Sequence, residues 1–313
     1  MSGPRVVSLL PSATEVLASL GAEDLLVGRS HECDWPPSIL DRPALTAQRQ
    51  REPIAAANES RAIDETVRAS LAAGQSLYTL DETLLAELAP DVILTQDLCE
   101  VCSIDLPTVE RVAARLPSRP TVVQLHPTSL FDVLDDILRV GDAIGRPHAA
   151  MAAMVSLRDR YWRAVDFVNP FVRGPEVAFL EWLAPVFVGG HWTPELIEAA
   201  GGQHSLNRPR SKSRVATPEE LLAAAPRRVI VAPCGWPLER IRAELPALTG
   251  QRWWPLLAAG LEEGPDAAVL VDGNAMFNRP GPRLVDAFEW LVGWINDRPE
   301  LVPIDFPVLP FRA

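Results

Sequence analysis

The residues with the greatest chemical potential in this chain lie in a short segment near its amino terminus. The sequence HECDWPP, at residues 31–37, places an imidazole, a thiol, a carboxylate and an indole within five positions, as His31, Cys33, Asp34 and Trp35. Because two successive prolines fit neither a helix interior nor a central strand, the segment is predicted to be a loop. Its residue types are suited to binding a metal or a partly apolar ligand.

A second segment, DLCEVCS at residues 97–103, contains a C-x-x-C pair. Two thiolates at this spacing can bind one soft metal, and the neighbouring loop offers two further ligands. The predicted set for zinc or iron is Cys33, Cys99, Cys102 and His31. Two alternatives stay open: the pair packs as small apolar residues, or it is redox-active. Acidic neighbours raise a thiol pKa, and this counts against the redox alternative.

Aromatic and imidazole side chains recur in other predicted loops. Trp35, Trp192 and Trp236 could form flat apolar walls for a planar macrocycle, and ordinary core packing is the alternative. His31 or His191 could bind the metal of such a ligand axially. The remaining residues predicted to contact a ligand are Cys234, Arg214, Asn278 and Arg279. The arginines belong to local basic clusters suited to carboxylate, phosphate or amide groups.

The first half of the chain alternates apolar strands with helices. Strands are predicted at 5–10, 25–30, 91–96 and 120–125. Ser12 with Glu15 forms a predicted capping box, Asp81 a predicted helix cap, and a helix is expected over 63–73. This β-α-β order predicts a parallel sheet covered by helices. Since ligands bind where parallel strands end, the two cysteine-containing loops are expected on one edge of that sheet.

The same order returns in the second half. A mainly helical stretch at 128–168, with a break at Pro147, separates the halves. Strands follow at 176–183, 227–233 and 267–273, and Thr217 with Glu220 forms another predicted capping box. The prediction is an α/β protein of two Rossmann-like lobes, at 1–126 and 170–313, joined by a connecting helix at 127–169. The cleft between the lobes is the expected ligand site.

The expected strand-end loops contain all four cysteines and three of the five histidines. These loops are 31–37, 97–103, 126–128, 184–192, 234–237 and 273–281. Cysteines placed at random would not favour one rim of the fold. We therefore expect thiols, imidazoles and indoles from distant segments to meet at one site.

Composition limits the function further. The chain has 313 residues, 48% of them hydrophobic, and a formal net charge of −12, which argues against nucleic acid as the partner. No run of 18 apolar residues predicts a membrane span, and no signal peptide is evident. The sequence as it stands predicts a cytoplasmic protein with reduced thiols, or a periplasmic or lipid-anchored one if a leader has been removed.

Four segments, in order, carry a resemblance to a known family. They are RVVSLLPSATEVLASLGAEDLLVGRSHECDWP, LDETLLAELAPDVILTQ, EWLAPVFVGGHWTPELIEAAGG and SRVATPEELLAAAPRRVIVAPCG. Together they resemble the helix-linked (class III) substrate-binding proteins of ABC importers, in particular the cobalamin-binding members. The resemblance spans nearly the whole chain. Against that family, residues 46–76 look like an insertion, and the C-x-x-C pair is not part of the general pattern.

The resemblance implies a two-lobe binding protein that closes on cobalamin, another corrinoid or a related metal chelate, and that delivers it to an ABC permease. The alternative is a cytosolic metal- or thiol-dependent enzyme, or a metal-binding protein, that uses the Cys/His cluster. The sequence contains no G-x-S-x-G, P-loop or G-x-G-x-x-G motif in a suitable context, so a catalytic function has little support. Ligand identity, permease and oligomeric state stay open.

Overall fold

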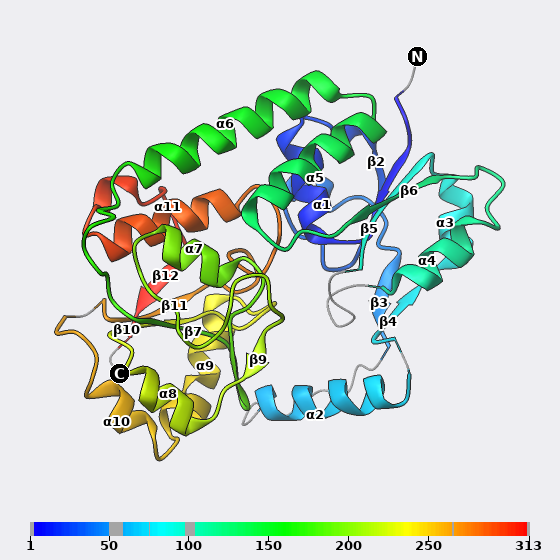
Figure 1. Ribbon diagram of the computed structural model, residues 1–313. Coiled ribbons are helices and arrows are strands. Elements are labelled where there is room, and N and C mark those ends of the chain that lie inside the picture. The colour runs from blue at the N-terminus through cyan, green and yellow to red at the C-terminus, as the bar shows by residue number, and fades with distance from the viewer. Residues whose placement is uncertain (1–2, 50–58, 75, 98–103, 265, 312–313) are drawn as a thin grey trace. The chain divides into compact units, whose positions relative to one another are not determined.

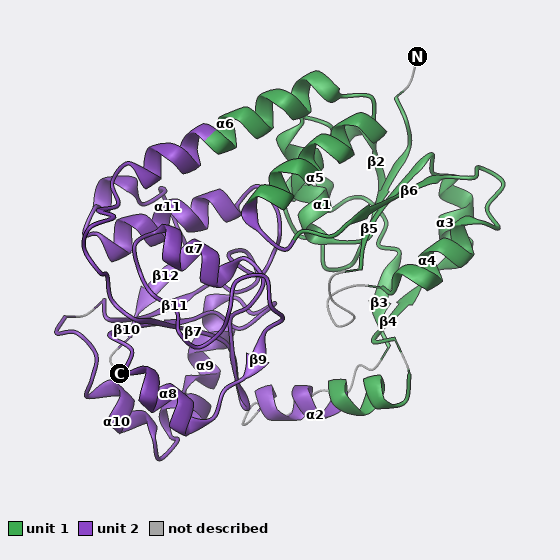
Figure 2. Cartoon of the chain, in the orientation of Figure 1, with its two compact units in different colours: residues 1–53, 67–127, 131–158 green, residues 54–66, 128–130, 159–313 purple. Residues whose placement is uncertain are grey.

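The protein is described by a computed structural model that covers residues 3–49, 59–74, 76–97, 104–264 and 266–311 (Figure 1). The chain divides into two compact units, each built around its own sheet (Figure 2). Unit 1 comprises residues 1–53, 67–127 and 131–158, and unit 2 comprises residues 54–66, 128–130 and 159–313. The predicted α/β class is confirmed.

Unit 1 contains a parallel sheet of four strands in the order β2-β1-β5-β6. The strands are β1 (Val6–Ser8), β2 (Leu26–Arg29), β5 (Val92–Gln96) and β6 (Thr121–Leu125), all of which the sequence predicted. The central strands are fully buried because both faces of a parallel sheet are covered by helices. The helices are α1 (Pro11–Ser19), α3 (Glu82–Leu88), α4 (Leu106–Ala113) and α5 (Leu130–Ala143).

The start of α1 differs from the prediction. The helix begins at Pro11, the residue at its N-cap is Leu10, and no side chain caps it. Proline is favoured at the first helical position because its φ is already helical and its missing N–H is not needed there. Ser12 therefore lies inside the helix, and the predicted Ser12–Glu15 capping box is wrong.

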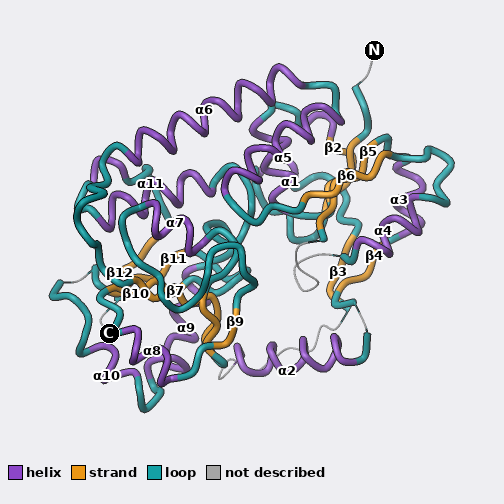
Figure 3. The backbone as a smooth tube through the Cα atoms, viewed as in Figure 1, coloured by secondary structure: helices purple, strands orange, loops and turns teal. Residues whose placement is uncertain are grey.

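Unit 2 contains a mixed sheet of six strands in the order β12-β11-β10-β7-β8-β9. Figure 3 colours the strands of the chain orange. The parallel centre of the unit 2 sheet consists of β7 (Val177–Leu183), β10 (Arg228–Val231) and β11 (Ala268–Val271), again as predicted. Three short antiparallel strands were not predicted: β8 (Val186–Val188), β9 (Arg214–Val215) and β12 (Val308–Pro310). They are two or three residues long, too short to show a period in the sequence.

The helices of unit 2 are α7 (Thr193–Ala199), α8 (Pro218–Ala224), α9 (Leu238–Thr249), α10 (Trp254–Ala258) and α11 (Leu284–Ile295). The predicted capping box of α8 is present: the Glu220 N–H donates to the Thr217 hydroxyl, and the Glu220 carboxylate accepts from the Thr217 N–H. α11 is buried over most of its length, as its nearly continuous apolar sequence requires.

Apart from α5, whose first residue Leu130 belongs to unit 2, two helices contain residues of both units. In α6 (Pro147–Val165), residues up to 158 belong to unit 1 and the rest to unit 2. In α2 (Glu59–Ala72), residues up to 66 belong to unit 2 and the rest to unit 1. The predicted break at Pro147 is confirmed, because α5 ends at Ala143 and Pro147 begins α6. β3 (Thr46–Gln48) precedes α2 in the sequence and β4 (Tyr78–Leu80) follows it. The two strands pair as a two-stranded antiparallel sheet.

Candidate functional site

The candidate residues follow the strands of each sheet at the edge where the parallel strands end, called the carboxyl edge below. In unit 1, the HECDWPP loop follows β2, and the chain that contains Asp97 follows β5. In unit 2, the segment after β7 and Cys234 after β10 hold the equivalent places. Among the described residues, strand-end loops expected from the sequence are therefore present in both units.

Cys33 is held inside unit 1 and has only 1% of its surface exposed. Its sulfur lies 3.1 Å from the hydroxyl of Thr14 in α1, and that hydroxyl lies 2.9 Å from the hydroxyl of Ser8. The Cys33 N–H donates to the Ser30 carbonyl, which fixes the turn of the loop. The thiol thus packs beneath the loop.

His31 lies in the same loop and has contacts at both ring nitrogens. Its Nδ1 lies 2.7 Å from the Thr46 hydroxyl, and its Nε2 lies 3.0 Å from a carboxylate oxygen of Glu32. The ring also meets Tyr78 at a centroid distance of 5.5 Å. The Nε2 atom is buried and forms no hydrogen bond with any described residue, so it is not exposed to a bound ligand.

The metal cluster predicted from the sequence is only partly within the described structure. Cys99 and Cys102 lie outside the described residues, so their relation to Cys33 and His31 stays a prediction. Among the residues that are described, no group of three or more His, Cys, Asp and Glu side chains is arranged to hold a metal ion. Neither described cysteine, Cys33 or Cys234, forms a disulfide.

A second histidine of unit 1, His126, is more exposed than His31. His126 follows β6, and its Nδ1 is hydrogen-bonded to one carboxylate oxygen of Asp97, which follows the adjacent strand β5. The other oxygen of Asp97 accepts from the amide of Gln124. The His126 side chain is 54% exposed, and among the described residues its Nε2 has no hydrogen-bond partner.

In unit 2, the carboxyl edge is organised around Glu181, near the end of β7. Both carboxylate oxygens accept from the Ser213 hydroxyl, at 2.9 and 2.8 Å, and the Gly190 N–H also donates to the group. Burial raises the pKa of Glu181 to about 7, although these hydrogen bonds act in the opposite direction. Gly190 approaches the 211–213 backbone so closely that a Cβ there would lie 2.4 Å from the Ser213 nitrogen.

The loops after β10 and β11 are tied to each other and to Glu181. The Cys234 N–H donates to the Glu181 carbonyl at 3.1 Å, which places the cysteine beside the end of β7. The amide of Asn278 donates to the carbonyls of Ala232 and Gly273, each at 2.9 Å. Arg279 is 9% exposed and donates to the side-chain oxygen of Asn274. Three predicted site residues, Cys234, Asn278 and Arg279, therefore belong to one network.

The three tryptophans predicted as walls differ in exposure. Trp35 is 38% exposed, beside the exposed Asp34, whereas Trp192 and Trp236 are only 4% and 2% exposed. The indole N–H of Trp192 donates to the Phe277 carbonyl. The ring of Trp236 contacts Trp182, with ring centroids 5.0 Å apart, and the guanidinium of Arg240 lies 4.3 Å from its centroid. In unit 2 both indoles are part of the packed interior that supports the loops.

The two remaining predicted residues are held by local bonds. His191 adopts a left-handed backbone conformation with φ of 52°, and its N–H donates to the Ser211 carbonyl at 2.6 Å. Arg214 donates to the Leu206 carbonyl and forms an ion pair with Glu220, the residue that completes the cap of α8. These bonds position the 189–191 and 211–214 segments beside Glu181.

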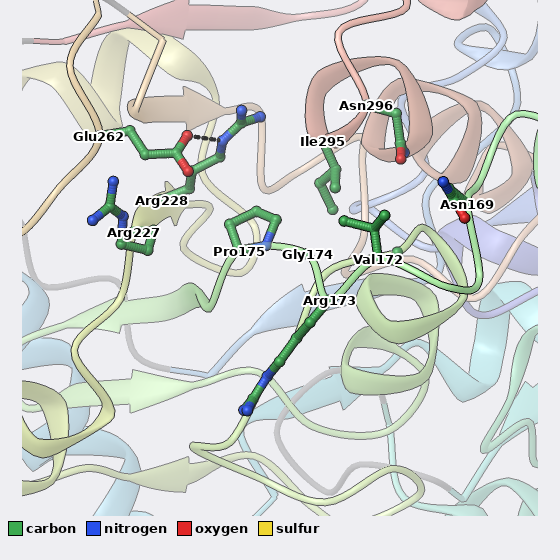
Figure 4. A pocket seen from close by; sticks show the side chains of 11 residues that line it. Asn169, Val172, Arg173, Gly174, Pro175, Arg227, Arg228, Glu262, Ile295 and Asn296 are labelled. Carbon is green, nitrogen blue, oxygen red and sulfur yellow. Dashed lines mark hydrogen bonds and ion pairs between the residues drawn. The ribbon is translucent and has the colours of Figure 1, made fainter.

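A cavity of about 540 Å³ lies at the opposite, amino edge of the unit 2 sheet (Figure 4). Its lining includes Pro175 before β7 and Arg227 before β10, together with the ion pair of Arg228 and Glu262 at 2.6 Å. Parallel α/β sheets bind ligands at the carboxyl edge, so this cavity is separate from the candidate site.

The comparison with solved structures gives consistent results. A periplasmic haem-binding protein from Pseudomonas aeruginosa matches with a TM-score of 0.69 and 23% identity, over 100% of this chain and 99% of that one. The periplasmic vitamin B12-binding protein BtuF of Vibrio cholerae matches with a TM-score of 0.65 and 19% identity, over 95% and 98%. This chain has the fold of the periplasmic substrate-binding proteins of ABC importers.

Other proteins with this fold match over similar lengths. The periplasmic haem-binding protein RhuT from Roseiflexus sp. RS-1, for example, matches with a TM-score of 0.67 and 19% identity, over 95% of this chain and 99% of that one. No protein-family model and no curated protein matches the sequence. Within the described part of the chain, no helix is both long and apolar enough to cross a bilayer.

Two features of the site were not recognised in the sequence. Glu181 stands in a strand, where its alternation with apolar neighbours gives no sign that its carboxylate meets Ser213. The Asp97–His126 pair could have been predicted from the sequence. Each residue directly follows a predicted strand, and neighbouring parallel strands end at the same edge of a sheet. His126 was placed on the rim, but the axial ligands considered were His31 and His191.

Proposed function

We propose that this protein is a substrate-binding protein for a metal chelate of the corrinoid or tetrapyrrole type, held by the carboxyl-edge loops of the two units and delivered to an ABC permease. The observation that carries the proposal is that this fold has hydrogen-bonded polar groups at both carboxyl edges. In unit 1 these are Asp97 and His126, and in unit 2 they are Glu181 and Ser213. Solved proteins with this fold include ones that bind haem and vitamin B12.

The composition of the two edges supports a ligand that is large, partly apolar and metal-bearing. Trp35 exposes part of an indole in unit 1, and aromatic faces bind planar macrocycles well. In unit 2, Asn278 and Arg279 hold in place the loops that would contact the amide or carboxylate side groups of such a ligand. A ligand cleft between the lobes, cobalamin as the ligand, and periplasmic localisation all stay predictions from the sequence.

The rival function is a cytosolic metal- or thiol-dependent enzyme, or a metal-binding protein, that uses the Cys/His cluster. The burial of Cys33 weighs against its use as a nucleophile, because reactive thiols need solvent or substrate access. Zinc or iron at Cys33, Cys99, Cys102 and His31 remains a prediction, since two of these cysteines lie outside the described residues.

Equilibrium dialysis against haemin and against aquacobalamin tests the proposal, with tryptophan fluorescence as a second readout. The proposal predicts saturable binding of one of the two at a defined stoichiometry. It also predicts that purified protein retains this binding after Cys99→Ser and Cys102→Ser substitution. Binding of neither chelate, together with stoichiometric zinc or iron that is lost in the Cys99→Ser variant, would support the rival instead.

A further inference from the structure

The structure gives the two histidines at the carboxyl edge of unit 1 different chemical roles. The Nδ1 of His31 lies near the Thr46 hydroxyl, and its Nε2 is buried beside Glu32, where it forms no hydrogen bond with any described residue. His126 uses only Nδ1, which is bonded to Asp97. A histidine that binds the metal of a ligand needs a nitrogen that the ligand can reach, so the buried Nε2 of His31 and the 54% exposed side chain of His126 are not equivalent candidates.

The Asp97 carboxylate fixes the tautomer of His126. An ionised carboxylate only accepts hydrogen bonds, so the ring must donate through an Nδ1–H. The neutral imidazole then has its lone pair on Nε2. Metal-binding histidines in proteins typically have this arrangement, in which a carboxylate accepts from the other ring nitrogen, fixes the ring orientation and increases its basicity.

Asp97 is itself oriented from its other side. The Gln124 amide donates to the second carboxylate oxygen, so both oxygens have a partner. Gln124 and His126 both come from the end of β6, and β6 pairs with β5 in parallel register from Val92–Thr121 to Gln96–Leu125. The position of the imidazole is therefore set by the sheet itself, and the 54% exposed side chain leaves its outer face accessible.

We propose that His126 is an axial ligand through Nε2 to the metal of the bound chelate, and that Asp97 is its positioning residue. This inference rests on the proposed function and specifies which residue of unit 1 contacts the metal. Binding is a ligand exchange without oxidation or reduction. The Nε2 lone pair forms the bond to the metal, the metal–water bond at that axial position breaks, the water leaves, and the Nδ1 proton stays between His126 and Asp97.

The proposal accounts for the polarity of this corner of unit 1. An exposed carboxylate–imidazole pair contributes little to stability, because surface ion pairs are worth on the order of 0–1 kcal/mol. As a metal ligand, the same pair gains a specific chemical function, and outer-shell partners of metal-binding histidines typically affect metal affinity by about 10- to 100-fold.

The test uses the full chain with haemin and aquacobalamin as probes, and compares wild type with His126→Ala, Asp97→Asn and His148→Ala. His148 is an exposed histidine in α6 of unit 1 and serves as the matched control. Absorption spectra report the axial ligand, and dialysis reports affinity separately. The expected wild-type spectrum is that of a nitrogen-ligated chelate, lost in His126→Ala and unchanged in His148→Ala.

Two further results sharpen the test. Asp97→Asn should retain the nitrogen-ligated spectrum while weakening binding about 10-fold or more, the size of an outer-shell effect. Added imidazole should restore the wild-type spectrum in His126→Gly, which a purely structural histidine would not permit. Circular dichroism of each variant confirms that it is folded.

The failures of the two proposals are distinguishable. If wild type binds a chelate and His126→Ala gives the same spectrum and affinity, the inference is overturned while the proposed function stands. If wild-type protein binds neither chelate by dialysis or fluorescence, the proposed function fails and the inference fails with it.

Discussion

Ser60 donates both its backbone N–H and its hydroxyl to a single carboxylate oxygen of Glu244, at 3.0 and 2.8 Å. Ser60 is the second residue of α2, so the carboxylate satisfies one of the free N–H groups at the helix start and lies at the positive end of its dipole. Both residues are buried, and Trp182 donates its indole N–H to the Ser60 carbonyl. The first turn of α2 is thereby attached to the core of unit 2.

Glu244→Ala is expected to release this turn. The substitution leaves the buried Ser60 N–H without its acceptor, at a cost of about 1 to 3 kcal/mol. Hydrogen exchange measured by mass spectrometry should show faster exchange in residues 59–66, and urea unfolding should show lower stability. Ser60→Ala removes only the hydroxyl and should cost about 1 kcal/mol. Equal exchange of the helix start in wild type and Glu244→Ala would refute this account of the attachment.

Glu181 makes the stability of unit 2 dependent on pH. Its folded-state pKa of about 7 lies above the ordinary value of 4.5, so ionisation is harder in the folded than in the unfolded chain. Below pH 4.5 the group is protonated in both states and costs nothing. Between pH 4.5 and 7 the unfolded state ionises first, so its contribution to stability falls as pH rises and stays low above pH 7.

Glu181→Gln should therefore be more stable than wild type at pH 8, by at most about 3 kcal/mol for a shift of this size, with little difference at pH 4.5. Partial exposure of the side chain makes the true value smaller than this limit. Denaturant unfolding at several pH values measures the difference. A stability difference between the two proteins that is constant from pH 4.5 to pH 8 would rule out the raised pKa as its cause.

The two described thiols should differ in reactivity. Cys234 is partly exposed at the carboxyl edge of unit 2, whereas Cys33 is 1% exposed beneath its loop. Alkylation of the native protein, followed by peptide mass spectrometry, should label Cys234 rapidly and Cys33 only slowly. Both should react at similar rates in denaturant. Rapid native labelling of Cys33 would show that its loop opens readily.

The central strands of both sheets could be predicted from the sequence because they are short apolar runs bounded by turn residues. Residues 91–96, which contain β5, are one example. Helix caps were predictable where the cap is local: Asp81 caps α3 and Thr217 caps α8, each through a backbone N–H three residues later. The Ser12 cap failed because Pro11, one residue earlier, offers an equally good helix start.

Contacts between distant residues could not be predicted in the same way. The acceptor for the start of α2 is Glu244, 184 residues away, and no local pattern indicates that pairing. The same holds for Glu181 and Ser213. For Trp192 and Trp236 the sequence left open whether the indoles line a ligand site or a core, and their low exposure shows that they are packed within unit 2.

The location of the ligand site is the central claim, and hydrogen exchange with and without a saturating chelate tests it most directly. The account predicts protection of the carboxyl-edge segments, at 126–128 in unit 1 and at 189–191, 211–213 and 273–279 in unit 2. The amino-edge segment at 227–228, beside the separate cavity, should exchange at the same rate in both samples. Protection at 227–228 without protection of the carboxyl-edge segments would contradict the account.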